Sequence, residues 1–204
     1  MLNVFARASV GRVTDPIGRW LVDRGVTPDA VTVLGTVGTV AAAVWFIPRG
    51  ELVIGAWVIT AFVLFDLVDG AMARARGQGT PFGAVLDSTC DRIADGALFA
   101  ALAWWCLGVG GQRTLGIAAL LCLVAGQLIS YIKARAEGAG LSADGGLVER
   151  AERLIIALLG MFLEGIGVTY ALAVALWVLA AASVWTVGQR LVVVYRSAQA
   201  TSAR

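Results

Sequence analysis

Apolar segments long enough to cross a membrane follow one another along most of this chain of 204 residues. Hydrophobic residues make up 59% of the sequence and charged residues only 15%, whereas a soluble domain carries about 25% charged residues. Since a membrane-spanning helix needs roughly 20 mostly apolar residues, the sequence predicts an all-α integral membrane protein with six transmembrane helices. The predicted spans, of which the fifth is the shortest, lie near residues 30–48, 52–75, 84–108, 114–137, 151–167 and 169–195.

The N-terminal residues have a different pattern. Four arginines interrupt residues 2–26 too often for a membrane span, although apolar side chains recur there at helical spacing. The apolar positions are Val10, Val13, Ile17, Trp20 and Leu21. This pattern predicts an amphipathic helix that lies in the membrane interface. We therefore expect one membrane domain over residues 1–204, divided into an interfacial helix (1–28), a six-span bundle (29–195) and a tail (196–204).

Basic residues are concentrated on one side of the predicted bundle. The N-terminal segment, the loops after the second and fourth spans and the C-terminal end contain 13 of the 16 Lys and Arg residues. By the positive-inside rule, both termini and these loops face the cytoplasm of a multi-pass cell-membrane protein. No tract is basic enough to indicate nucleic acid as a partner. Histidine is absent, which excludes His-dependent catalytic triads and His-ligated zinc.

Four aspartates lie where the second and third spans approach each other. Asp66 and Asp69 are three residues apart, and Asp87 and Asp91 are four apart, so each pair shares one face of its helix. Burying one ionised carboxylate costs several kcal/mol, and oxygen ligands without histidine or thiolate favour a hard cation. We interpret the four as a site for two Mg²⁺ ions, with Mn²⁺ as the alternative metal. Paired ions are common in phosphate-transfer chemistry.

Two other interpretations of these acids remain open. They can form buried salt bridges with Arg74, Arg76 and Arg92, or they can carry protons or cations in a membrane transporter. Transport is disfavoured because all four acids lie at the predicted cytoplasmic ends of their helices and the chain has no obvious inverted repeat.

The spacing of the acidic stretch resembles the signature of the CDP-alcohol phosphotransferases. The residues that carry this resemblance are Asp66-x-x-Asp69-Gly70-x-x-Ala73-Arg74 and, eight residues later, Gly83-x-x-x-Asp87-x-x-x-Asp91. Members of that family transfer a phosphatidyl-type group from a CDP-linked membrane lipid to an alcohol and release CMP. The resemblance implies CDP-diacylglycerol as the lipid substrate and a homodimeric protein.

The resemblance also implies roles for individual residues. Asp66, Asp69 and Asp87 would bind the first metal ion, while Asp66, Asp87 and Asp91 would bind the second. Asp91 would also be the general base that takes the proton from the acceptor hydroxyl. The residues expected to bind the CDP-lipid are Asp29, Ala30, Val31, Thr32, Gly70, Arg74 and Thr80.

Polar residues near the cytoplasmic ends of the last three spans indicate an acceptor site. They are Ser130, Lys133, Arg153 and Arg190. Cations are expected at such helix ends in any case, but together they suit an acceptor that carries a phosphate. The stretch SYIKARAEGAGL (130–141) and the following ERAER (149–153) resemble the family branch that makes phosphatidylinositol phosphate from CDP-diacylglycerol and inositol phosphate. The alternative within the family is a phosphatidylglycerophosphate synthase, whose acceptor is glycerol 3-phosphate.

Three further features carry smaller expectations. Asp95 extends the face of Asp87 and Asp91 by one helical turn, so we expect it to support the site in a pair with Arg92. The Gly-rich connection 136–153 is expected to be able to close over the site. The three cysteines are expected to be packing residues.

Overall fold

The computed structural model describes residues 14–76 and 79–202. Its long helices are α2 (Pro28–Phe46), α3 (Leu52–Ala75), α4 (Pro81–Leu107), α5 (Arg113–Gly138), α6 (Arg150–Gly165) and α7 (Ala171–Ser202), with a short 3-10 helix, η1 (Ile47–Arg49), after α2. Residues 14–23 form a further helix before α2, and no strand occurs among the described residues. The prediction of an all-α protein is therefore confirmed.

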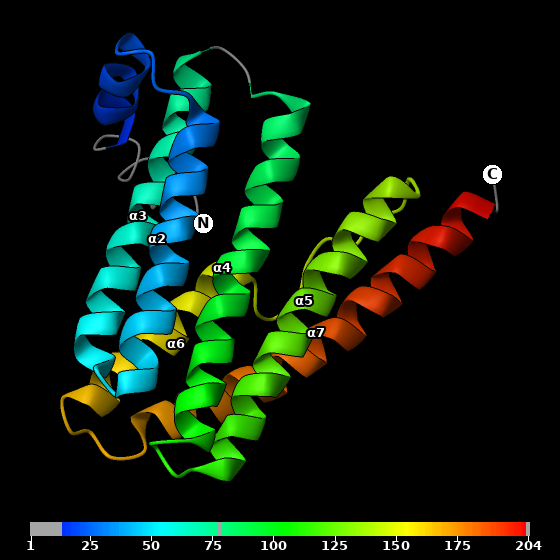
Figure 1. Cartoon of the computed structure of the whole chain (residues 1–204). Coiled ribbons are helices and arrows are strands. Elements are labelled where there is room, and N and C mark those ends of the chain that lie inside the picture. Colours follow the sequence, from blue (N-terminus) through cyan, green and yellow to red (C-terminus); the bar gives the residue numbers. More distant parts are fainter. Residues whose placement is uncertain (1–13, 77–78, 203–204) are drawn as a thin grey trace.

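The helices form two groups that diverge at one end of the molecule. In Figure 1, α2, α3 and α4 run side by side, while α5 and α7 lean away from them toward their C-terminal ends. The diverging ends are the ones at which α3 ends and α4 begins. Asp66 and Asp69 lie in the second half of α3, and Asp87 and Asp91 in the first half of α4, so the four aspartates of the predicted metal site lie toward this end.

Local sequence signals set the starts of the helices. Thr27 caps α2 and Thr80 caps α4, each with its hydroxyl accepting a backbone N–H three residues later, and each is followed by proline. These are favoured residues for an N-cap and a first helical position. Because of the Thr80 cap, α4 begins three residues before the predicted span. The reciprocal pair of Glu149 and Glu152 forms a capping box at the start of α6.

Four helical segments are long and apolar enough to cross a membrane. They are Pro28–Arg49, Leu52–Ala75, Arg113–Gly138 and Ala171–Ala200. Helix α4 differs because it carries Asp91, Arg92 and Asp95 within its apolar part, and α6 has only 16 residues. The structure thus supports a membrane protein with four candidate spans among the described residues.

The helices pack through small side chains around one large apolar core. A Cβ atom on Gly160 of α6 would lie 2.5 Å from the Cβ of Ala175 in α7, so this helix pair requires glycine at the contact. Cys106 and Cys122 are fully buried in the same core, and Cys90 is also buried. The cysteines are thus packing residues, as predicted.

The N-terminal helix, residues 14–23, crosses the end of α3. A Cβ atom on Gly18 would lie 3.0 Å from the backbone nitrogen of Met72, and Leu21 and Val22 pack against the same region of α3. Ile17 and Trp20 remain exposed. The other apolar positions of the predicted stripe, Val10 and Val13, lie outside the described residues.

Candidate active site at the diverging helix ends

Three of the predicted metal ligands converge where α3 meets α4. One carboxylate oxygen from each of Asp66, Asp69 and Asp87 lies within 4.8 Å of the others. We call these three residues the aspartate cluster. None of them forms an ion pair with a described Lys or Arg. Asp66 Oδ1 is buried and has no hydrogen-bond partner in the described part of the chain. Because a buried carboxylate oxygen is costly without a partner, this all-oxygen donor set fits a divalent cation.

Helix α2 joins the aspartate cluster through Thr32. The Thr32 hydroxyl donates to Asp69 Oδ2 and lies 3.2 Å from the carbonyl oxygen of Pro28 one turn earlier. Thr32 is buried, so this contact fixes how Asp69 faces its two neighbours.

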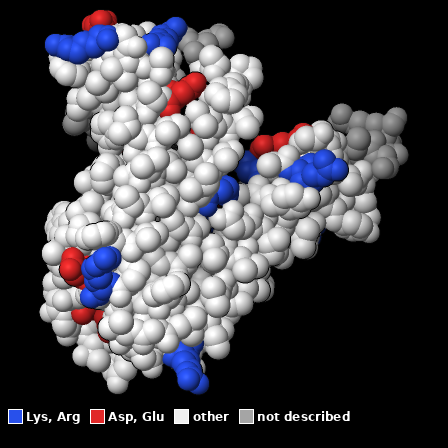
Figure 2. Space-filling model, in the orientation of Figure 1, with Lys and Arg blue, Asp and Glu red and all other residues white. Residues whose placement is uncertain are grey.

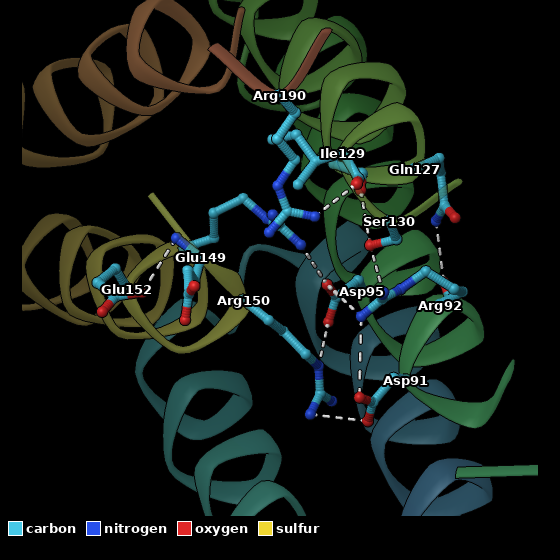
Figure 3. Close-up of polar contacts among 12 residues, drawn as sticks. Asp91, Arg92, Asp95, Gln127, Ile129, Ser130, Glu149, Arg150, Glu152 and Arg190 are labelled. Atoms are coloured by element: carbon cyan, nitrogen blue, oxygen red, sulfur yellow. Dashed lines mark hydrogen bonds and ion pairs between the residues drawn. The ribbon is translucent and has the colours of Figure 1, made fainter. Parts of the chain in front are cut away.

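The fourth predicted metal ligand, Asp91, has different surroundings. It lies one helical turn after Asp87, but its Oδ1 is 2.7 Å from Nη1 of Arg150 on α6, and its Oδ2 is 3.8 Å from Arg92. Figure 3 shows the Arg150 side chain reaching from α6 to Asp91. The structure therefore brings three of the four signature acids together and pairs the fourth with arginine.

Asp95 continues this pairing deeper in the bundle. Its carboxylate contacts Arg153 at 3.0 Å, Arg150 at 3.2 Å and Arg92 at 3.8 Å, and the residue is only 4% exposed. The expected pair with Arg92 is present, but the two shorter contacts come from α6. We call Asp91, Asp95, Arg92, Arg150 and Arg153 the arginine network; it contains two acids and three cations.

The sequence prediction missed Arg150. Its position was visible in the stretch 149–153, where Arg150 and Arg153 are three residues apart and share one face of α6. Of the four signature acids, the salt-bridge interpretation thus holds, within the described chain, only for Asp91, which pairs with Arg92 and more closely with Arg150. Arg74 pairs with Asp15 instead, and Arg76 donates to the carbonyl oxygen of Val26.

A cavity of about 530 Å³ lies beside the aspartate cluster, between the ends of α2, α3 and α4. Asp69 and Asp87 line it, and so does Arg76. Four of the residues predicted to bind the CDP-lipid also line it, namely Asp29, Thr32, Gly70 and Thr80. We call this space the smaller cavity.

The other three residues predicted to bind the CDP-lipid do not line the smaller cavity. Val31 is buried against Val68 and Met72, and Ala30 is exposed. Arg74 pairs with Asp15 of the N-terminal helix at 3.0 Å. Four consecutive residues cover a whole helical turn, so the run 29–32 does not line a single cavity with all its side chains.

A second cavity, of about 1040 Å³, lies among α4, α5, α6 and α7. We call it the larger cavity, and it is lined by all four residues predicted to bind the acceptor: Ser130, Lys133, Arg153 and Arg190. Arg92 and Arg150 also line it. Figure 2 shows basic side chains in the hollow between the diverging groups of helices. The predicted acceptor residues therefore share one cationic space.

These four residues differ in how many hydrogen bonds and ion pairs they already make with other groups of the protein. Ser130 accepts a hydrogen bond from Arg92, and Lys133 lies 3.8 Å from carboxylate oxygens of both Glu137 and Asp144. Arg190 donates to two backbone carbonyls, at 2.8 and 3.1 Å. Arg153 is 1% exposed and its Nε has no partner among the described residues.

The connection between α5 and α6 lies against α7. The backbone nitrogen of Val148 donates to the Thr186 hydroxyl at 3.2 Å, and that of Leu147 donates to the Gln189 side chain at 3.0 Å. Arg190 Nε donates to the Gly145 carbonyl at 3.1 Å. This part of the Gly-rich connection is therefore tied to α7 beside the larger cavity.

Comparison with known proteins identifies the family. The model of the CDP-alcohol phosphatidyltransferase family matches residues 25–188. The phosphatidylinositol phosphate synthase of Mycobacterium tuberculosis is 54% identical over 199 residues, which cover 96% of this chain and 92% of that protein. The enzyme of the same name from Corynebacterium glutamicum is 48% identical over 198 residues, covering 97% and 90%.

Solved structures agree with this assignment. The crystal structure of the M. tuberculosis phosphatidylinositol phosphate synthase with CDP-DAG bound has a TM-score of 0.88 and 55% identity, covering 91% of this chain and 95% of that one. The structure of the same enzyme with manganese and citrate has a TM-score of 0.87, covering 91% and 90%. With its signature residues gathered at one end of a matching helical fold, the chain belongs to the CDP-alcohol phosphatidyltransferase family.

Proposed function

We propose that this protein is a phosphatidylinositol phosphate synthase. It transfers the phosphatidyl group of CDP-diacylglycerol to a hydroxyl group of inositol phosphate, and the products are phosphatidylinositol phosphate and CMP. The observation that carries the proposal is the position of the signature acids between a smaller cavity at the family motif and a larger cavity lined by cations. The relatives that bear this enzyme name support the choice of acceptor.

The aspartate cluster is proposed to hold divalent metal. Asp66, Asp69 and Asp87 would bind one ion, and Asp91 would join Asp66 and Asp87 for a second. We favour Mg²⁺, with Mn²⁺ as the alternative, and the manganese complex of the M. tuberculosis relative supports a divalent ion of this class. When bound, such ions stabilise the negative charge that develops on the phosphates during transfer.

The CDP group is proposed to occupy the smaller cavity. Asp29, Thr32 and Thr80 offer polar groups there, and Gly70 leaves room beside the α3 backbone. Arg76 places a cation in the wall of this cavity, and Arg74, which pairs with Asp15, lies next to Gly70. The structure of the M. tuberculosis relative with CDP-DAG bound supports a nucleotide-lipid site in this fold.

The acceptor is proposed to place its phosphate among Ser130, Lys133, Arg153 and Arg190. Asp91 takes the proton from the attacking hydroxyl, whose oxygen then bonds to the lipid-side phosphorus of CDP-diacylglycerol. The phosphoanhydride P–O bond breaks, and CMP leaves with the electron pair of that bond. Asp91 suits this role because it lies between Asp87, which lines the smaller cavity, and Arg150, which lines the larger one.

The membrane arrangement completes the proposal. All six long helices would cross the cell membrane as one domain, with the active site facing the cytoplasm and the N-terminal helix in the interface. The charged residues of α4 lie between its N-terminus and its middle, in the part proposed to be nearer the cytoplasm. Intramembrane charges of this kind are tolerated where they pair or bind a ligand. We also expect a homodimer, as size-exclusion chromatography with light scattering would measure.

The proposal is tested by identifying the lipid product. The purified chain in detergent is incubated with CDP-diacylglycerol, Mg²⁺ and inositol phosphate, and the lipids are analysed by mass spectrometry. Phosphatidylinositol phosphate is the expected product. Its absence, with phosphatidylglycerophosphate formed when glycerol 3-phosphate is supplied instead, would contradict the proposed acceptor while keeping the family chemistry.

A further inference from the structure

Arg150 connects the larger cavity to the proposed base. It is the first residue of α6, lines the larger cavity, and bridges two acids of α4. Its Nη1 is 2.7 Å from Asp91 Oδ1, and its Nε is 3.2 Å from Asp95 Oδ1. Figure 3 shows both contacts made by the same guanidinium group. Arg150 is therefore the residue through which an occupant of the larger cavity can act on Asp91.

The Arg150–Asp91 contact opposes the proposed role of Asp91. The short, charge-assisted bond to Arg150 holds Asp91 Oδ1, so this oxygen is not free to bind the second metal ion or to face the acceptor hydroxyl. Loss of this contact would leave both Asp91 oxygens without a short bond to arginine, since Oδ2 lies 3.8 Å from Arg92.

The arginine network has donors to offer to an anion. Its three arginines exceed its two acids by one positive charge, and Arg92 Nε and Arg153 Nε are buried without partners in the described chain. Arg153 is also 1% exposed and lines the larger cavity. Because buried donors without partners are costly, the network suits an additional anionic ligand.

We propose that Arg150 is a positioning residue that makes Asp91 available only when the acceptor's phosphate is bound. The phosphate in the larger cavity attracts the Nη atoms of Arg150 away from Asp91, while the Nε contact with Asp95 serves as the pivot. One charge-assisted bond replaces another, so the exchange has a small net cost. The inference rests on the proposed function, and it gives the acceptor's phosphate a second role: a polyol without phosphate leaves Asp91 paired.

Metal binding tests the exchange without turnover. Mn²⁺ is titrated into the purified full-length chain by isothermal calorimetry, without CDP-diacylglycerol, in the presence of saturating inositol phosphate or of inositol. In the wild type, inositol phosphate is expected to release Asp91 and so to lower the Kd for Mn²⁺ about fivefold or more. A fivefold change is at the low end of the coupling usually measured between two binding sites. In Arg150→Gln, inositol phosphate is expected to change the Kd for Mn²⁺ by less than about twofold, whatever the affinity of this variant for Mn²⁺ alone.

Lys133→Gln is the matched control. It removes a cation from the same cavity that contacts Glu137 and Asp144 and makes no contact with Asp91. In Lys133→Gln, saturating inositol phosphate is expected to lower the Kd for Mn²⁺ by the same factor as in the wild type. Equal coupling in wild type and Arg150→Gln, or equal loss in both variants, would overturn the role of Arg150.

Two further measurements keep the inference falsifiable if Arg150→Gln folds poorly. A structure of the wild type with inositol phosphate is expected to show Arg150 on the phosphate and apart from Asp91, and an unchanged contact would refute the exchange. In activity assays, Arg150→Gln is expected to narrow the preference in kcat/KM for inositol phosphate over inositol about tenfold, whereas a parallel loss for both acceptors would indicate a structural role only. If the wild type shows no turnover with any acceptor, the proposed function is refuted. The Mn²⁺ titration would still show whether inositol phosphate releases Asp91 from Arg150.

Discussion

The aspartate cluster and the arginine network are two polar sites in one apolar bundle, and they handle buried charge in opposite ways. The cluster groups three carboxylates with no described cation in contact, and one of its oxygens is buried without a partner. The network surrounds two carboxylates with three arginines. Both draw on successive turns of the same face of α4, since Asp87, Asp91 and Asp95 are each four residues apart.

This difference indicates how the proposed chemistry is divided. Carboxylates left without protein cations are suited to metal ions, whereas surplus guanidinium groups are suited to phosphate. Asp91 is the acid of the network that lies one helical turn from the cluster, and among the described residues it is the signature acid that pairs with arginine. Substitutions in the aspartate cluster should therefore lower activity more than stability. Substitutions at Asp95, deep in the arginine network, should lower stability more than activity.

The largest effect is expected from the aspartate cluster. Asp66→Asn or Asp87→Asn should lower kcat/KM at least about 10⁴-fold, because metal ions stabilise the transition state by several kcal/mol and each factor of ten corresponds to about 1.4 kcal/mol. Removal of divalent metal with EDTA should have the same effect on the wild type. Asp23→Asn, which alters an exposed acid on the N-terminal helix, is the control and should keep wild-type activity. Substantial turnover in Asp66→Asn would separate the cluster from the chemistry.

Asp91→Asn should come next, with turnover reduced about 10³-fold, a typical contribution of a general base. The smaller cavity does not involve the Asp91 side chain, so CDP-diacylglycerol should still bind with near wild-type affinity, as measured by thermal stabilisation. Retained activity would remove Asp91 from the role of base.

Asp95→Asn should mainly affect stability. Breaking a buried ion pair by removing one partner costs about 3–5 kcal/mol, and here Arg153 would be left buried with less compensation. Thermal unfolding in detergent should therefore begin at a clearly lower temperature than in the wild type. Asp87→Asn is the matched variant on the same helix and should not be destabilised, since it removes no ion pair. Equal stability of the two variants would contradict the distinction drawn between the sites.

The smallest of these effects is expected at the rim of the larger cavity. Lys133→Ala should raise the KM for inositol phosphate about tenfold with little change in kcat, because one charge-assisted bond to phosphate is worth roughly 1.5 kcal/mol. Arg135→Ala, an exposed cation two residues away that does not line the cavity, is the control. An unchanged KM for inositol phosphate in Lys133→Ala would show that Lys133 does not bind the acceptor and is simply a cation at the cytoplasmic end of its helix.

Features set by neighbouring residues were predictable from the sequence. The α3 span was predicted with its observed bounds, and the aspartates of α3 and α4 share helix faces because of their spacing. The helix cap at Thr27 follows from local preference, whereas the cap at Thr80 was not predicted and makes α4 begin three residues before the predicted span. The convergence of Ser130, Lys133, Arg153 and Arg190 was also predicted, because each lies near the predicted cytoplasmic end of its helix.

Features that depend on how distant helices approach each other were not predictable. Arg150 meets Asp91 from 59 residues further along the chain, and only the docking of α6 on α4 brings them together. Arg74 belongs to the family signature but pairs with Asp15, because the N-terminal helix crosses the end of α3. The number of membrane crossings was predicted from the lengths of the apolar segments. That criterion takes no account of the charged residues within α4.

The most direct test of the account is the rate of CMP release from CDP-diacylglycerol with inositol phosphate, inositol and glycerol 3-phosphate supplied separately, each with Mg²⁺ and with EDTA. We expect Mg²⁺-dependent release that is much faster with inositol phosphate than with either of the other two acceptors. Equal release with inositol and inositol phosphate would contradict the role given to the arginine-lined cavity, and release that persists in EDTA would contradict the role given to the aspartate cluster.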